Sequence, residues 1–167
     1  MNKAIIRETD LRFSNLARRT STKRIVIHHS GTVQDLDLSA AQIHQAHKAK
    51  GWAGIGYHFV IRKNGAIERG RPLWSLGAHA QSNNHDTIGI HLSGDFNSAT
   101  PTDYQIESLA LLIANLSADF NIPIDRAHVI GHDECYSKFT DGAGCPGRNL
   151  YKLLDTIAGK AAWYLKN

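Results

Sequence analysis

The sequence has few of the features that mark disulfide-rich or membrane proteins. Only two of its 167 residues are cysteine, Cys135 and Cys145, which is too few for a disulfide framework. No stretch approaches the roughly 18 consecutive apolar residues that a membrane-spanning helix requires. Residues 1–19 contain no apolar core of the length found in signal peptides. We therefore expect a protein without a membrane span that begins its life in the cytoplasm.

Positive charge is in slight excess but is not concentrated in a way that indicates a nucleic-acid-binding surface. The net charge is +4 with histidine neutral and the pI is about 9.2, which would suit an anionic partner. The main basic cluster comprises Arg18, Arg19, Lys23 and Arg24. It lacks the interleaved aromatic residues of a nucleic-acid groove, so nucleic acid is not the expected partner.

Strand and helix patterns alternate along a chain whose length and 42% hydrophobic content suit one domain. Residues 1–22 lack periodicity and are predicted to be an N-terminal arm packed on a domain of residues 23–167. Strands are predicted at 24–29, 57–62, 66–69, 87–92 and 128–132, and helices at 40–50, 103–120 and 149–165. Asn64-Gly65 predicts an antiparallel hairpin. The expected fold class is therefore α/β, a single domain with a central mixed β-sheet flanked by helices.

The ends of the predicted helices carry recognisable signals. Ser39 is expected to cap the first helix and Gly51 to end it. Thr102 or Asp103 should cap the long second helix. Gly159 is a potential break in the terminal helix.

Several of the ten histidines lie where a predicted strand ends. His28 and His29 close the first strand on opposite faces, and His132 closes the last. Cys145 lies in the polar, glycine-rich loop that follows. A catalytic zinc ion needs about three nitrogen, sulfur or oxygen ligands and one open position for water. Two histidines and a cysteine would suffice, but most histidines are surface or hydrogen-bonded core residues, so the spacing alone does not specify a metal site.

Seven segments, in the same order, resemble the zinc-dependent N-acetylmuramoyl-L-alanine amidase family, which includes bacteriophage lysozyme-type amidases and peptidoglycan recognition proteins. They span most of the chain between residues 25 and 151. The segments are IVIHHSGT (25–32), GWAGIGYHFVI (51–61), GAIERGR (65–71), GAHA (77–80), NHDTIGI (84–90), GHD (131–133) and CPG (145–147).

This resemblance implies a ligand set for Zn²⁺. His28 matches the first ligand of the family, His132 the second and Cys145 the third, while His29 would be a neighbour on the other face. His128 lies four residues before His132 and remains its rival. Cys135 is the rival of Cys145, and its expected role is that of a small buried side chain or a free thiol.

The resemblance also implies roles for residues around the ion. Tyr57 matches the tyrosine that faces the zinc-bound water and would be catalytic. His79 is a candidate for binding substrate or for supporting the site, and a plain loop hydrogen bond is the alternative. His58 is expected to be structural, as are His44 and His47, which lie three residues apart on a helix without a matched third donor.

The chain departs from the family pattern at one position. Many relatives carry lysine or threonine two residues before the third ligand, where it can stabilise an oxyanion, but this chain has Ala143. Lys138 or Thr140, in the longer loop before Cys145, would be the possible replacements.

The implied activity is hydrolysis of the peptidoglycan amide bond that joins N-acetylmuramic acid to L-alanine. A monomeric phage or prophage endolysin, held in the host cytoplasm before lysis, is the expected setting. The alternatives are a non-catalytic peptidoglycan-binding module and a cytoplasmic cell-wall recycling amidase. A regulatory protein partner of the N-terminal arm is neither supported nor excluded.

Overall fold

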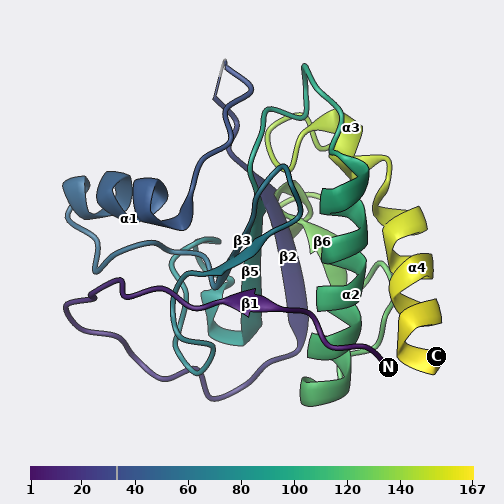
Figure 1. The fold of residues 1–167 in the computed structure, drawn as a ribbon, viewed down its shortest axis with the longest axis horizontal. Coiled ribbons are helices and arrows are strands. Elements are labelled where there is room, and N and C mark those ends of the chain that lie inside the picture. Colours follow the sequence, from purple (N-terminus) through teal and green to yellow (C-terminus); the bar gives the residue numbers. More distant parts are fainter. Residues whose placement is uncertain (33) are drawn as a thin grey trace.

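A six-stranded mixed sheet forms the centre of the computed structural model, which describes residues 1–32 and 34–167 (Figure 1). The strands are β1 (Ile6–Arg7), β2 (Arg24–His29), β3 (Phe59–Ile61), β4 (Ile67–Arg69), β5 (Thr87–Leu92) and β6 (Val129–Gly131), in the order β1-β4-β3-β5-β2-β6. β3 and β4 form the predicted antiparallel hairpin, and the other neighbours are parallel. The predicted α/β class with a mixed sheet is confirmed.

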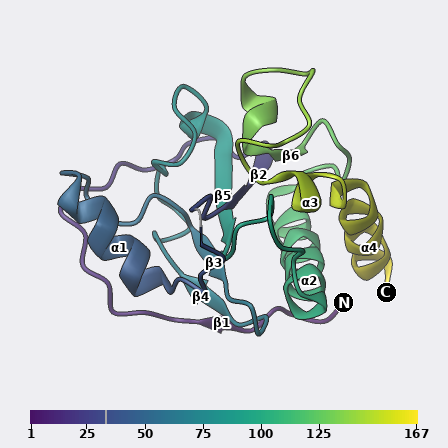
Figure 2. The same ribbon diagram turned by 90° about the horizontal axis from the view of Figure 1, so that it is seen from above.

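Helices cover the two faces of this sheet unequally. They are α1 (Ala40–Ala49), α2 (Asp103–Phe120), α3 (Arg148–Tyr151) and α4 (Leu154–Lys166), with short 3₁₀ turns η1 (Asn84–Asp86) and η2 (His132–Cys135). α2 and α4 lie on one side of the sheet and α1 on the other, as both views show (Figures 1 and 2). No helix among the described residues has the length and apolar character needed to cross a membrane.

Alternation along β2 decides what each face contains. Ile25 and Ile27 point into the main core, together with residues of α2 and α4. The next residues along the strand, Val26 and His28, therefore point to the opposite face, which α1 covers only in part. A buried polar site can form there without interrupting the apolar core.

The starts of α1 and α2 have the side-chain caps that the sequence predicted. The Ser39 hydroxyl accepts the backbone N–H of Gln42, whose side chain accepts the Ser39 N–H in return. Thr102 and Gln105 form the same reciprocal pair at α2, which identifies Thr102 as its cap.

The predicted break at Gly159 is wrong. A two-residue turn at Lys152 and Leu153 separates α3 from α4, while Gly159 lies inside α4. Ile157 and Ala161 are buried in the main core on either side of it. Their packing outweighs the cost of about 1 kcal/mol that one glycine imposes on a helix.

Gly159→Ala should stabilise the fold. A Cβ at this exposed position would meet no atom within 4 Å, so the methyl group adds no strain. We expect a gain of about 0.5–1 kcal/mol in the free energy of unfolding and a rise of roughly 2–4 °C in Tm, measured by thermal and denaturant unfolding. An unchanged or lowered Tm would contradict this placement of Gly159.

The N-terminal arm contributes a strand that the sequence did not predict. β1 adds to the edge of the sheet, with Ile6 opposite Ile67 of β4. The backbone that precedes β1 is also held, because the Asn115 side chain accepts the Ala4 N–H and donates to the Asn2 carbonyl. Two residues are too few for a strand to appear as periodicity in the sequence.

Candidate metal centre

Two neighbouring parallel strands place the first two histidines together. Ile27 of β2 lies opposite Gly131 of β6, so the residues that follow, His28 and His132, meet at the same edge of the sheet. Their ring centroids lie 4.4 Å apart. His28 is buried, whereas His132 is half-buried and can be reached from outside.

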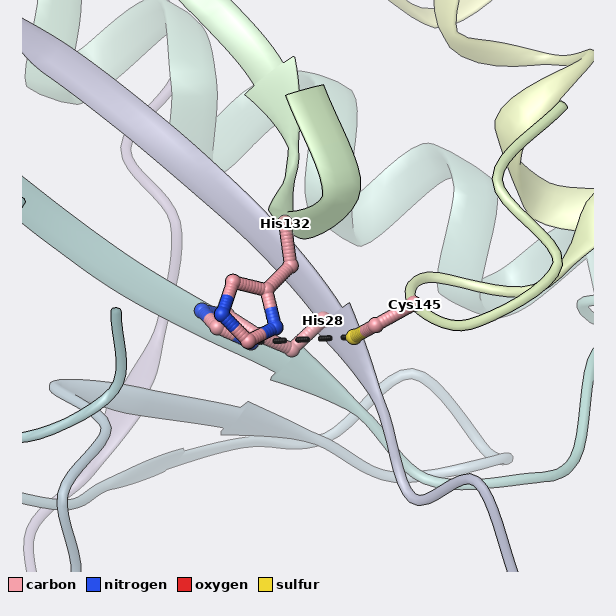
Figure 3. Close-up of side chains that lie close together, drawn as sticks. All are labelled: His28, His132 and Cys145. Atoms are coloured by element: carbon pink, nitrogen blue, oxygen red, sulfur yellow. Dashed lines mark hydrogen bonds between the residues drawn. The ribbon is translucent and has the colours of Figure 1, made fainter. Parts of the chain in front are cut away.

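Cys145, in the loop after η2, lies beside these two histidines. His28, His132 and Cys145 are called the group below. The Sγ of Cys145 lies 3.7 Å from His28 Nδ1. One candidate ligand atom from each of His28, His132 and Cys145 lies within 4.8 Å of the others, and the three side chains converge from β2, from the start of η2 and from a loop (Figure 3). The structure thus brings together the three residues that the resemblance implied.

The side chain of Asp133 ties the cysteine loop to the second histidine. Its two carboxylate oxygens accept the backbone N–H groups of Gly144 and Cys145, at 3.0 and 3.1 Å. Its own N–H donates to the Cys145 carbonyl at 2.9 Å. Because Asp133 follows His132 directly, the two candidate ligands are joined by three hydrogen bonds. Sequence reasoning assigned Asp133 no role, since nothing local to it indicates a bond to residues eleven and twelve positions away.

His29 supports the same loop from the opposite face of β2. Its Nδ1 accepts the Phe96 N–H, so its Nε2 is left to donate to the Gly144 carbonyl at 2.9 Å. Its backbone N–H donates to Cys145 Sγ at 3.4 Å. His29 thus holds the third candidate ligand in place without belonging to the group.

The protonation states of the group suit a metal ion. Burial lowers the pKa of His28 well below its usual value, with nearby His79 and His132 adding to the effect, and burial also lowers the pKa of His132. Both imidazoles are therefore neutral at neutral pH and have a lone pair to offer. Burial raises the pKa of the Cys145 thiol to about 12. Only a cation would make this buried sulfur a thiolate at neutral pH, and zinc does so.

Tyr57 borders the group from the segment just before β3. Its ring lies 4.9 Å from that of His28, centroid to centroid. Burial, with a smaller contribution from Cys145, raises the pKa of its hydroxyl above its usual value. Tyr57 therefore remains a hydrogen-bond donor at all moderate pH values and cannot act as a base there.

The histidines of α1 position the segment that carries Tyr57. His44 Nδ1 accepts the Ile55 N–H at 3.0 Å, and His47 Nδ1 accepts the Gly56 N–H at 2.9 Å. These contacts fit the structural role expected for both. His58 fits its expected structural role too, because its Nδ1 accepts the Gly89 N–H and its Nε2 donates to the Ser75 carbonyl.

The two rival ligands, His128 and Cys135, lie outside the group, as do Lys138 and Thr140, the possible replacements for the oxyanion-stabilising residue. His128 is bound to Asp125 through Nδ1 at 2.6 Å, and Cys135 is not one of the three converging residues. The Thr140 hydroxyl faces Asp133 at 3.4 Å, and Lys138 is exposed. No contact among the described residues places either of the last two at the group.

One hollow adjoins the group and a second adjoins Tyr57. One, of about 520 Å³, is lined by Trp52, Ala78, His79, Ala80, Gln81, Asn84, His132 and Tyr136. The other, of about 260 Å³, includes Ser30, Tyr57 and His91 in its lining. His132 lines the first hollow and Tyr57 lines the second, and a part of a long substrate could bind in either. Tyr136, in the lining of the first hollow, was not predicted as a site residue, because nothing in the sequence of its loop distinguishes it.

The family model for N-acetylmuramoyl-L-alanine amidase matches residues 18–148. The chain belongs to this family. The endolysin of Escherichia phage T7 is 36% identical over 116 residues, which cover 66% of this chain and 77% of that protein. Peptidoglycan-recognition protein SC2 of Drosophila melanogaster is 30% identical over 138 residues, covering 78% and 71%. The structure of the endolysin amidase LysCS from Clostridium intestinale URNW superposes with a TM-score of 0.80 at 32% identity, covering 95% of this chain and 97% of that one.

These comparisons confirm the resemblance drawn from the seven segments. The matched range includes His28, Tyr57, His132 and Cys145. The similarity to LysCS covers 95% of this chain.

The buried histidines should make the fold sensitive to acid. Burial lowers the pKa of His58 and of His91 to about 3, whereas an unfolded histidine titrates near 6.5. Between these values the unfolded chain binds more protons than the folded chain. The contribution of the two histidines to the free energy of unfolding is therefore fully present above about pH 6.5 and is lost as the pH falls toward 3. Each group contributes up to about 1.4 kcal/mol per pH unit, or together up to about 4 kcal/mol between pH 8 and pH 5. Urea unfolding of the metal-free protein at both pH values measures this, and equal stabilities would contradict it.

Proposed function

We propose that this protein is a zinc-dependent amidase that hydrolyses the bond between N-acetylmuramic acid and L-alanine in peptidoglycan. The observation that carries the proposal is the convergence of His28, His132 and Cys145 beside a hollow that His132 lines, in a chain that belongs to the amidase family. Three protein donors with an open side are the arrangement of a catalytic zinc site, because a structural zinc site has four.

The residues present fit a zinc ion. The two neutral imidazoles and the sulfur would hold it, and the thiol would lose its proton on binding. When bound, the ion supplies a Lewis acid that activates water and polarises the carbonyl of the bond to be cut.

Tyr57 would supply the hydrogen bond that this reaction needs. Because its hydroxyl keeps its proton, it can donate to the oxygen on which negative charge develops as the carbonyl is attacked. Asp133 and His29 have no contact with substrate in this scheme. They hold Cys145 at its place through the backbone of the loop.

The larger hollow suits a glycopeptide. Trp52 and Tyr136 are exposed on its lining, with 42% and 56% of their surface open to solvent. Such amphipathic rings can contact a sugar or a peptide through their faces, and the Tyr136 hydroxyl donates to the Gln81 carbonyl at 2.9 Å. The attacked carbonyl would lie beside His132, where this hollow meets the candidate metal centre.

The biological setting that we infer is bacterial lysis by a phage or prophage endolysin. The endolysins of Escherichia phage T7 and Enterobacteria phage T3, both 36% identical, support it. In this setting the protein would be a monomer that stays in the host cytoplasm until lysis and then acts on the cell wall.

Product analysis distinguishes this proposal from its alternatives. Purified sacculi and soluble muropeptides are each incubated with the protein, and the products are identified by mass spectrometry. We expect stem peptides with a free L-alanine amine from both substrates, with intact sacculi cut efficiently. Cleavage of soluble muropeptides alone would favour a recycling amidase, and binding to sacculi without products would indicate a non-catalytic module.

A further inference from the structure

His79 is a buried histidine whose two ring nitrogens are both engaged. Its Nδ1 lies 2.9 Å from Nε2 of His28, and its Nε2 lies 3.1 Å from the Thr87 hydroxyl. Burial lowers the pKa of His79 well below its usual value, so the ring is neutral at neutral pH. Since neither nitrogen is free, the contacts of His79 favour support of the site over a hydrogen bond to substrate.

The hydrogen bonds from His28 to His79 and from His79 to Thr87 form a hydrogen-bond chain, and the Thr87 hydroxyl fixes the direction of each bond in it. That hydroxyl donates its only proton to the Asn83 carbonyl at 2.7 Å. It can therefore only accept from His79, which requires the proton of His79 to be on Nε2. Nδ1 of His79 is then a bare acceptor, so the bond to His28 requires a proton on His28 Nε2. His28 Nδ1 is left with its lone pair, and this is the atom that faces Cys145 Sγ.

The ring of His79 is also fixed sterically. It lies between the backbone at Gly77 and at Gly89, where a Cβ would come within 2.6 Å of ring atoms at either position. The backbone of the loop is held as well, because the Asn84 side chain accepts the N–H groups of His79 and Ala80. These contacts hold the ring and the loop in the orientation that the hydrogen bonds of His79 require.

We propose that His79 is a positioning residue that, through Thr87 and the Asn83 carbonyl, sets the tautomer of His28 so that Nδ1 is the atom offered to the metal ion. Without this chain, neutral His28 would divide between two tautomers, and one of them directs an N–H at the ion. The purpose of the chain rests on the proposed zinc-dependent function, although the hydrogen-bond chain itself exists without metal.

The tautomer can be observed directly in metal-free protein. Long-range ¹H–¹⁵N spectra of ¹⁵N-histidine-labelled protein at neutral pH distinguish Nδ1–H from Nε2–H. We expect His28 and His79 both to carry the proton on Nε2. A proton on Nδ1 of His28 would overturn the proposal, whatever the protein does to sacculi.

Zinc affinity, measured by competition with a chromophoric chelator, tests the consequence. His79→Phe keeps the ring volume but removes the acceptor, and should weaken zinc binding about 10–100-fold, as changes behind a metal-binding histidine typically do. His79→Asn retains an oxygen near the position of Nδ1 and should recover most of that loss. Thr87→Val keeps His79 but frees its tautomer, and should give an intermediate loss.

Two results of the affinity measurements would also overturn the proposal. One is zinc affinity of His79→Phe within twofold of the unaltered protein, and the other is equal losses in His79→Phe and His79→Asn, which would indicate packing alone. If His79→Phe does not fold, Thr87→Val and the spectrum of the unaltered protein still decide. A protein that shows the expected tautomer and affinities but leaves sacculi uncut would contradict only the proposed function.

Discussion

Cys145→Ala should abolish activity, because it removes the sulfur that we propose as the third zinc ligand. We expect zinc affinity to fall by about 10²-fold or more, beyond the 10–100-fold typical of residues that merely support a ligand. The fold should survive, because Asp133 and His29 hold the loop mainly through backbone atoms. Elemental analysis, turnover on sacculi and Tm, measured on one preparation, test this expectation.

Cys135→Ala is the matched control. Cys135 lies in the same part of the chain but outside the converging group, so its removal should leave zinc content and turnover within about twofold of the unaltered protein. Zinc loss in this variant, with retention in Cys145→Ala, would show that the other cysteine is the ligand.

Tyr57→Phe should leave the protein folded and zinc-loaded but largely inactive. The substitution removes one hydroxyl and keeps the ring that packs beside His28. If the hydroxyl donates to the developing negative charge, its loss costs about 10²-fold or more in kcat, or roughly 3 kcal/mol. Turnover on sacculi, zinc content and Tm together measure the effect.

A structural tyrosine would give the opposite pattern. Losing a hydrogen bond that serves only the fold costs about 1 kcal/mol of stability and leaves turnover nearly unchanged. Full activity in Tyr57→Phe would therefore remove this residue from the mechanism. The metal ion would then be the one catalytic element left in the scheme.

Local sequence patterns were enough to predict most of the sheet and the place of the first histidine. The β-branched run of β2 and the two-residue period put His28 and His29 on opposite faces, as observed. Asn64-Gly65 predicted the hairpin for the same local reason. By contrast, β1 is too short for any period, and the end of α3 carries no glycine or proline that would mark it in the sequence.

The choice between rival ligands needed information that is not local. His128 and His132 lie at the two ends of one short strand, and only the register of β6 beside β2 brings His132 to His28. Cys145 was preferred to Cys135 by family resemblance. The physical cause is the set of bonds from Asp133 to the backbone of Gly144 and Cys145, which no composition or spacing could indicate. The engagement of both nitrogens of His79 is likewise a property of the folded chain alone.

Removal and return of zinc tests the central claim most directly. The protein is freed of metal with a chelator, the chelator is washed out, and sacculi are digested before and after addition of one equivalent of Zn²⁺. The account predicts no cleavage without metal, and with zinc the release of stem peptides whose L-alanine amine is free, identified by mass spectrometry. Release of those peptides by the metal-free protein, or products cut at any other bond after zinc is returned, would contradict it.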